Sequence, residues 1–252
     1  MSRYICVDIG GTSIKHGVLD ENAIIEESNQ TKTEAWLGGA EVLDKVKAIG
    51  KQYMEQYENI EGICISTAGM VDPEEGKIVF AGELMPDYTG TCIKKELEKT
   101  LGIPCEVEND VNCAGLAEYI SGAAKESHIM FCATVGTGIG GCAIVDGSVF
   151  HGASNSACEI GYIPMEDSDF QTLGASSILI KKVAGKKREP LDMWDGKKIF
   201  ELAEKGDEVC ISAIKEMCDV LGKGLATICY VLNPDTIVLG GGVMAQKKIL
   251  EK

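Results

Sequence analysis

Three short polar side chains, Asn109, Asp110 and Asn112, stand close together in the segment Cys105–Gly115, CEVENDVNCAG. The apolar residues before them predict a short strand, and those after them recur at helical spacing. Residues just beyond the carboxyl end of a strand are where an α/β sheet meets its ligand. The Asp110 carboxylate could therefore accept a proton there. Alternatively it caps the helix, because Asn and Asp are good N-caps and a carboxylate suits the positive helix end.

Glycine-rich turns between strands lie on both sides of this segment, at Asp8–Lys15 and Val135–Gly141. Glycine lets the backbone approach a ligand closely, so that N–H groups can point at phosphate oxygens. The first turn contains Gly10, Gly11 and Thr12, followed by a positive charge at Lys15. An ordinary hairpin is the alternative interpretation, because Gly-Gly is a common turn pair.

Asp8 places a carboxylate near the end of the apolar strand Tyr4–Ile9. A charge that ends a buried strand costs several kcal/mol unless a partner compensates it. Mg²⁺ is a fitting partner for such a carboxylate. Two phosphate-binding turns with a carboxylate between them suggest phosphoryl transfer.

The 252-residue chain has a formal net charge of -15 and is 45% hydrophobic, which is ample for a core. This acidity argues against nucleic acid or an anionic membrane as partner, because both recruit Lys and Arg. A nucleotide can still be held by backbone N–H groups and a metal ion. No signal peptide precedes the first strand, and no apolar run approaches the roughly 18 residues of a membrane span. We therefore expect a cytoplasmic protein.

The eleven cysteines are scattered and odd in number, and several lie in apolar runs: Cys6, Cys64, Cys132, Cys142 and Cys229. This usage predicts buried, reduced thiols. With three histidines and no C-x-x-C, a structural zinc site is not expected.

The hydrophobic pattern predicts alternating strands and helices. The expected strands are Tyr4–Ile9, Ile14–Leu19, Ala23–Glu27, Gly62–Ser66, Lys77–Phe80, Ile129–Val135, Cys142–Val145, Ser148–His151 and Thr236–Leu239. The expected helices are Glu41–Tyr57, Ile93–Leu101, Asp110–Gly122, Leu173–Val183, Lys197–Ala203 and about Asp207 to Leu232. In the last helix, Gly222 and Gly224 each cost about 1 kcal/mol relative to Ala. We interpret them as close packing against the sheet, with a nucleotide contact as the alternative.

One strand pair repeats within the chain. GVLDENAII at Gly17–Ile25 and AIVDGSVFH at Ala143–His151 both read as apolar strand, acidic turn and apolar strand. A repeat of this length indicates a duplicated domain rather than a solenoid. We expect two lobes, residues 1–112 and 113–252, that meet in the helix after Asp110.

Five motifs, in order along essentially the whole chain, resemble the ROK family: DIGGTSIK, SxAG at Ser66–Gly69, ENDVNCAG, VGTGIGG and IVLGGG. That family groups sugar kinases and transcriptional repressors. The resemblance implies an α/β, duplicated actin-like fold (ribonuclease H-like, hexokinase type) with two lobes and a central cleft. It also implies ATP and Mg²⁺ as cofactors, and the family often forms homodimers.

The resemblance also implies roles for particular residues. Asn109 and Asp110 match the family's sugar-binding Asn and catalytic base, Glu159 matches its sugar-binding Glu, and Gly69 would lie at the sugar. Asp8 would lie near the metal. The nucleotide would contact Gly10, Gly11, Thr12 and Lys15 in the first phosphate loop, Thr137, Gly138, Gly140 and Gly141 in the second, and Gly240, Gly241 and Gly242 at the adenosine.

The sequence departs from the family pattern in three places. Tyr162 replaces the histidine of the usual E-x-G-H motif, and the cysteine cluster that should follow is missing. Gln171 stands near the place of a sugar-contacting glutamate and would substitute as a neutral group. Similar losses occur in the β-glucoside kinase branch, so no zinc is expected. Relatives also continue past this C-terminus, so the second lobe looks truncated.

The leading interpretation is an ATP-dependent sugar kinase in which Asp110 takes the proton of a hydroxyl, expected to be the 6-OH of a hexose or β-glucoside. One alternative is a non-catalytic sugar-sensing protein. The family's repressors carry an N-terminal helix-turn-helix, whereas here the first strand starts at Arg3 or Tyr4. A second alternative is a weakly active, truncated remnant. The pattern does not name the sugar.

Overall fold

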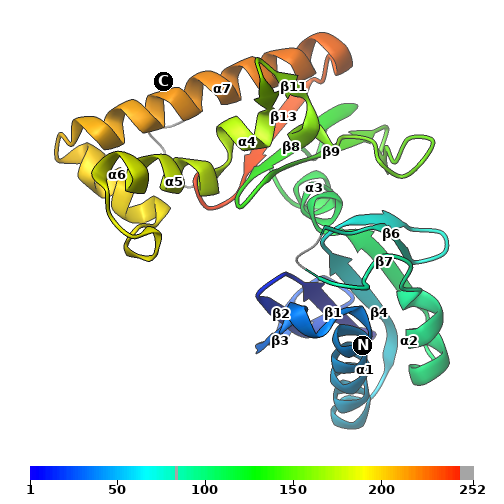
Figure 1. The fold of residues 1–252 in the computed structure, drawn as a ribbon. Coiled ribbons are helices and arrows are strands. Elements are labelled where there is room, and N and C mark those ends of the chain that lie inside the picture. Colours follow the sequence, from blue (N-terminus) through cyan, green and yellow to red (C-terminus); the bar gives the residue numbers. More distant parts are fainter. Residues whose placement is uncertain (83–84, 245–252) are drawn as a thin grey trace. The chain divides into compact units, whose positions relative to one another are not determined.

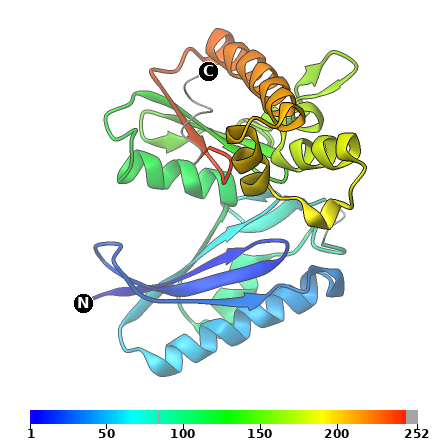
Figure 2. The same ribbon diagram turned by 90° about the vertical axis from the view of Figure 1, so that its left-hand side faces the viewer.

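The computed structural model describes residues 1–82 and 85–244 of this mixed α/β protein. Its backbone divides into two compact units, Met1–Cys113 and Ala114–Lys252. Figures 1 and 2 show the first unit in blue to green and the second in green to red. Each unit is built around its own sheet and its own hydrophobic core.

The first unit contains a five-stranded sheet in the order β3-β2-β1-β4-β7. β1 pairs antiparallel with β2, and β2 with β3, while β4 runs parallel to β1 and β7 parallel to β4. The strands are β1 (Arg3–Ile9), β2 (Ser13–Asp20), β3 (Ile25–Lys32), β4 (Ile60–Thr67) and β7 (Cys105–Asn109). A short hairpin, β5 (Met70–Asp72) and β6 (Lys77–Phe80), follows β4.

Two helices cover one face of this sheet, α1 (Gly39–Gln56) and α2 (Ile93–Leu101), preceded by a 3-10 turn at Ala35–Leu37. In Figure 2, α1 lies along the sheet (light blue). The alternation of β1 explains the arrangement: Ile5, Val7 and Ile9 are buried, whereas Cys6 and Asp8 lie on the other face. That second face carries the polar side chains of the candidate site.

The second unit repeats this topology. Its sheet has the order β10-β9-β8-β13, in which β8 and β9 are antiparallel and β13 runs parallel to β8. The strands are β8 (Ile129–Val135), β9 (Ile139–Val145), β10 (Ser148–Val149) and β13 (Thr236–Gly240). The order therefore matches β3-β2-β1-β4 strand for strand, as the duplicated sequence pattern predicts.

Helices lie on both faces of the second sheet. The helix α3 (Asp110–Ile120) contacts one face, where a Cβ on Gly115 would lie 2.7 Å from the Cys142 sulfur. The opposite face is covered by α4 (Phe170–Gly174), α5 (Ser176–Lys187), α6 (Gly196–Glu204) and α7 (Glu208–Leu232) (Figure 1). Smaller elements are the 3-10 turns Ile160–Tyr162 and Leu191–Met193 and the hairpin β11 (Pro164–Met165) and β12 (Ser168–Asp169).

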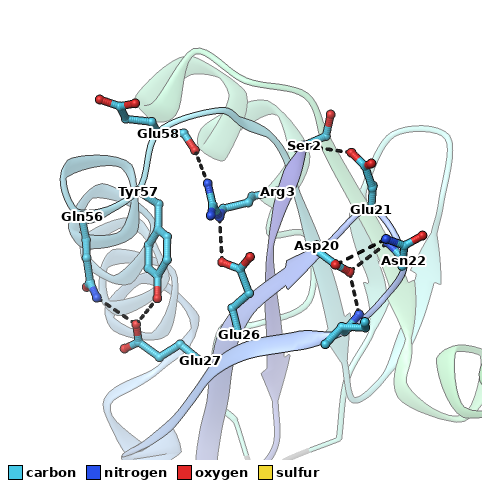
Figure 3. Close-up of polar contacts among 11 residues, drawn as sticks. Ser2, Arg3, Asp20, Glu21, Asn22, Glu26, Glu27, Gln56, Tyr57 and Glu58 are labelled. Atoms are coloured by element: carbon cyan, nitrogen blue, oxygen red, sulfur yellow. Dashed lines mark hydrogen bonds and ion pairs between the residues drawn. The ribbon is translucent and has the colours of Figure 1, made fainter.

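The third strand is longer than predicted. We expected Ala23–Glu27, whereas β3 runs from Ile25 to Lys32. Its side chains are mostly exposed, so no apolar alternation marks it. Polar contacts attach it instead (Figure 3): Glu27 accepts hydrogen bonds from Tyr57 Oη at 2.6 Å and Gln56 Nε2 at 2.8 Å, and Arg3 Nε donates to Glu26 at 2.7 Å.

Two other expectations are wrong in detail. The single helix predicted at Leu173–Val183 is two helices, because Ala175 takes an extended conformation (φ −68°, ψ 154°) between α4 and α5. Of the five cysteines expected to be buried, Cys132 and Cys142 are buried, Cys6 is half-buried, and Cys64 and Cys229 are exposed. These two exposed cysteines lie on outward positions of elements whose opposite side forms the core. Among the described residues, no helix is long and apolar enough to cross a lipid bilayer.

The two glycines of α7 have different surroundings. A Cβ on Gly224 would meet the Phe170 ring at 2.2 Å, so this glycine is required for packing against α4 rather than against the sheet. A Cβ on Gly222 would meet nothing within 4 Å. Gly222 lines an apolar cavity of about 420 Å³ together with residues of β8, β13 and α7.

This difference predicts opposite effects of the same substitution. Gly224→Ala should lower the free energy of unfolding by about 1–3 kcal/mol, because it overpacks the buried Phe170 ring. Gly222→Ala should raise it by up to about 1 kcal/mol through helix propensity. Urea unfolding of both variants checks this. Equal stabilisation by both substitutions would show that Phe170 moves aside without cost.

Candidate active site

Asn109, the last residue of β7, caps the helix that follows. Its Oδ1 accepts hydrogen bonds from the backbone N–H groups of Val111 at 2.8 Å and Asn112 at 3.1 Å. Its Nδ2 donates to the carbonyl of Gly69 at 2.9 Å, which joins the cap to the turn after β4. Because Asn109 caps α3, a capping role is not needed to explain the carboxylate at Asp110.

Asp110 is the first residue of α3 and is exposed. One carboxylate oxygen accepts a hydrogen bond from the Val111 N–H at 2.9 Å. Although solvent reaches this side chain, the surrounding protein desolvates its charged form and raises its pKa above the ordinary value, and the nearby Asp8 carboxylate adds to the rise. Asp110 is thus a carboxylate with a raised affinity for protons.

Asp8 lies on β1 and is compensated by neighbouring residues. Ser66 Oγ donates to Asp8 Oδ1 at 2.9 Å, and Lys15 Nζ lies 3.7 Å from Oδ2. The side chain is 42% exposed, and Ser66 and Lys15 are the partners that compensate its charge within the protein. Two carboxylates that repel each other, Asp8 and Asp110, nevertheless suit Mg²⁺, which is commonly held by one or two carboxylates together with substrate phosphates.

The first glycine turn connects β1 and β2 as expected. The N–H of Gly10 donates to the Ser13 carbonyl at 3.1 Å, and Thr33 Oγ1 donates to the Gly10 carbonyl. A Cβ on Gly11 would meet no atom within 4 Å, so this position opens to space. Gly11 and Thr12 are both exposed or half-exposed and therefore available to a ligand.

The turn after β4 depends on a glycine conformation and on one pair of hydroxyl groups. Gly69 has φ +100° and a Cβ there would lie 2.7 Å from the Phe80 carbonyl, so only glycine fits this turn. Thr67 Oγ1 and Tyr88 Oη lie 2.8 Å apart, both buried. Burial raises the pKa of Tyr88 to about 12, so its hydroxyl keeps its proton. This pair connects the loop Met85–Tyr88 to the end of β4.

The second glycine turn is shorter than predicted. It spans Gly136–Gly138, with Gly136 N–H donating to the Gly138 carbonyl at 2.9 Å. Gly140 and Gly141, expected in the phosphate loop, lie within β9. A Cβ on Gly141 would lie 2.7 Å from both the Cys158 carbonyl and the Phe131 ring, so packing explains this glycine.

The start of α5 is attached to this turn. The Ser176 N–H donates to the Gly136 carbonyl at 3.0 Å, and Ser177 Oγ donates to the Thr137 carbonyl at 2.6 Å. The turn therefore lies beside the N-terminus of a twelve-residue helix. Such a terminus carries partial positive charge, which favours an anion.

A cavity of about 360 Å³ opens at this turn. It brings together the glycine turn, the end of β13, and the helices α5 and α6, lined by Gly136, Thr137, Ser176, Gly196, Lys197, Phe200, Gly242 and Val243. Thr137 and Gly242 were predicted for a nucleotide, whereas Ser176, Lys197 and Phe200 were not.

The other two glycines predicted at the adenosine have structural surroundings. Gly240 is the last residue of β13. Gly241 has φ +99°, and a Cβ there would lie 2.2 Å from the Val135 carbonyl, so the turn after β13 requires a glycine at this position.

Gln171 lies on α4 beside two glycines of the second unit. A Cβ on Gly138 would lie 2.8 Å from Gln171 Oε1, and one on Gly161 would lie 3.0 Å from it. Glu159 and Tyr162 flank Gly161 and are both exposed. Gln171 is therefore adjacent to the glycine turn and to the motif that contains Glu159.

The family model of the ROK family matches residues 4–252. The chain belongs to the ROK family. Among curated relatives, an uncharacterized Clostridium perfringens protein is 46% identical over 249 residues, 99% of this chain and 84% of that protein. A β-glucoside kinase of Klebsiella pneumoniae is 31% identical over 257 residues, which cover 98% of this chain and 84% of that enzyme.

Solved structures of ROK proteins superpose closely. A Streptococcus pneumoniae ROK protein in complex with sucrose gives a TM-score of 0.87 at 29% identity, covering 99% of this chain and 83% of that chain. A ROK glucokinase of Streptomyces griseus, in complex with glucose and AMPPNP, gives 0.81 at 28% identity, with 97% and 84% covered. The predicted duplicated, actin-like hexokinase fold is confirmed.

The described part of this ROK protein contains no group of three or more His, Cys, Asp or Glu placed to hold a metal ion. The prediction that the protein binds no zinc awaits metal analysis.

The surroundings of Asp110 predict a measurable coupling of two carboxyl groups. Without nucleotide or divalent cations, Asp110 should titrate above the usual value of about 3.9. Asp8→Asn should lower that midpoint, because removing a neighbouring negative charge favours ionisation. NMR titration of the carboxyl carbons measures both. Asp235, whose pKa is lowered by the His128 N–H, is the internal control. An unchanged Asp110 midpoint would contradict the coupling.

Proposed function

We propose that this ROK protein is an ATP-dependent sugar kinase in which Asp110 is the general base. The observation that carries the proposal is that Asn109 and Asp110, at the start of α3, differ in their contacts. Asn109 caps the helix, and the Asp110 carboxylate beside it is exposed and has a raised pKa. The family membership and the kinases among its relatives support the same activity.

Asp110 takes the proton of the sugar hydroxyl as that oxygen attacks the γ-phosphate of ATP. A general base works best when its pKa approaches the operating pH, and desolvation moves the pKa of Asp110 in that direction. The N–H of Val111 holds the carboxylate in place at 2.9 Å. The proton therefore has a fixed acceptor before phosphoryl transfer begins.

Asp8 is the residue that would hold Mg²⁺, with Ser66 and Lys15 orienting its carboxylate. When bound, the ion supplies charge neutralisation for the phosphates. Ser66 Oγ bonds to one carboxylate oxygen of Asp8, and Lys15 Nζ lies 3.7 Å from the other. Because this second contact is long and exposed, a divalent cation can replace it.

The 360 Å³ cavity of the second unit is the proposed nucleotide site. Backbone N–H groups of the glycine turn and the N-terminus of α5 suit phosphate oxygens. Lys197 supplies a cation and Phe200 an apolar surface at the same cavity. This arrangement lets a strongly acidic protein accept a polyanion without a basic patch.

The proposed substrate is a hexose or a β-glucoside, phosphorylated on its primary 6-OH. The relatives named β-glucoside kinase and glucokinase motivate this class. The Asn109 side chain donates to the Gly69 carbonyl and also contacts the Asp110 carboxylate, and it is the proposed sugar contact of the first unit. Glu159 and Gln171 are the proposed sugar contacts from the second unit, with the neutral Gln171 in place of a carboxylate.

Valine substitutions at the two open glycines test the nucleotide site. Gly11→Val and Gly242→Val place side chains where the protein itself has no atom within 4 Å. Both should fold normally and lose ATP affinity by about an order of magnitude or more, because the side chain occupies phosphate or ribose space. Gly185→Val, at an exposed glycine of α5 with equal room, is the control. ATP titration calorimetry that gives wild-type affinity for all three variants would refute the site.

Asp110→Asn separates chemistry from capping. The amide cannot take the hydroxyl proton, so kcat should fall by about 10²–10⁴, roughly 3–5 kcal/mol of barrier. Asn109 still caps α3, so the melting temperature should stay near that of wild type. Asn109→Ala is the matched variant and should cost about 1 kcal/mol of stability through the lost cap. A coupled assay over glucose and β-glucosides measures kcat. Near-wild-type turnover by Asp110→Asn would eliminate Asp110 as the base.

A further inference from the structure

Two cysteines of the first sheet lie side by side on neighbouring strands. Cys6 of β1 and Cys64 of β4 are direct partners in the parallel pairing. Both point away from the core, because the residues that flank them, Ile5, Val7, Ile63 and Ile65, are buried. Cys6 is half-buried and Cys64 is exposed, so the pair has one shielded and one accessible sulfur.

The spacing of paired strands suits a covalent bond between these sulfurs. Neighbouring strands lie about 4.7–4.9 Å apart. Disulfides join Cα atoms that are about 4.4–6.8 Å apart. Both side chains leave the same face at the same register position, so their Cα separation falls in the range that a disulfide can bridge.

We propose that Cys6 and Cys64 form a thiol–disulfide exchange site for low-molecular-weight disulfides, in which Cys64 attacks and Cys6 resolves. This site is distinct from the chemistry proposed for Asp110 and does not depend on it.

The exchange proceeds in two steps. The Cys64 thiolate attacks one sulfur of an external disulfide RS–SR, which forms Cys64–S–SR and releases RS⁻. The Cys6 thiol then loses its proton to RS⁻ or solvent and attacks the Cys64 sulfur, which forms the Cys6–Cys64 disulfide and releases the second RS⁻. The two protein thiols are oxidised by two electrons, and RS–SR is reduced to two thiols. A reducing thiol reverses the sequence.

The surroundings favour Cys64 as the attacking sulfur. Cys64 is the exposed member of the pair and Cys6 the half-buried one, so an external disulfide reaches Cys64 first. A hydrogen bond from the Cys6 thiol also lowers the pKa of Cys64, although burial and Glu106 on the adjacent strand oppose this shift. Burial raises the pKa of Cys105 and of Cys113 to about 12. The thiolate is the reactive form, so Cys64 is the preferred site among these three.

The pair also lies close to the proposed catalytic face. Asp8 and Ser66 follow Cys6 and Cys64 by two residues on the same strands and are themselves joined at 2.9 Å. A disulfide between the cysteines would therefore join β1 and β4 two residues before Asp8 and Ser66.

Mass spectrometry of the intact protein and of its non-reduced peptides tests the proposal, with oxidised glutathione as the probe. We expect the full-length chain to lose two hydrogen atoms and to yield a Cys6–Cys64 peptide, reversibly with dithiothreitol. Cys6→Ser should instead retain one glutathione on Cys64, because the resolving thiol is missing. Cys64→Ser should form no bridge.

Two controls address other thiols. Cys229→Ser removes an exposed cysteine of α7 and should leave the bridge unchanged. Cys113→Ser should also leave it unchanged, although Cys113 lies near Cys6. A stable glutathione adduct on Cys64 of the wild type would overturn the proposal. So would a bridge from Cys6 to Cys113, or modification of Cys229 with Cys64 unreacted.

Discussion

The unpaired N–H groups at the start of α3 impose the constraint on which the site depends. A helix begins with N–H groups that lack partners, and one side chain can satisfy only a few of them. Asn109 bonds to two of these groups through Oδ1 and uses Nδ2 to hold the carbonyl of Gly69. The end of β7, the turn after β4 and the start of α3 are therefore joined at one amide. Asp110, the next residue, shares only the Val111 N–H with Asn109.

Duplication produces two glycine turns with different surroundings. In the first unit, Gly11 of the turn between β1 and β2 has open space beside it. Asp8, Lys15 and Ser66 lie on β1, β2 and β4 near this turn. In the second unit the corresponding turn is bonded to Ser176 and Ser177 at the start of α5. The same strand order thus presents a carboxylate in one unit and a helix N-terminus in the other, which are the groups of the proposed cation and anion sites.

The net charge of the chain bears on how phosphate groups can be attracted. With a net charge of -15, the protein cannot attract phosphate through its overall field. In the proposed function local features do so: helix N-termini, glycine N–H groups, Lys197 at the cavity, and the proposed divalent cation at Asp8. The Asp8 carboxylate raises the pKa of Asp110, and two neighbouring carboxylates are the kind of pair that such a cation stabilises.

The sequence by itself indicated the duplicated arrangement, most element bounds and Asn109 and Asp110 as candidate site residues, because local periodicity, glycine spacing and an internal repeat report on local structure. The sequence did not separate capping from chemistry at these two residues, since both are good caps. Tertiary structure assigned the cap to Asn109 and raised the pKa of Asp110. It also packed Gly141 against Phe131 and brought Lys197 and Phe200 to the cavity. Contacts between residues distant in sequence leave no periodic signal, and β3 shows the same limit, because its polar anchors lie on other elements.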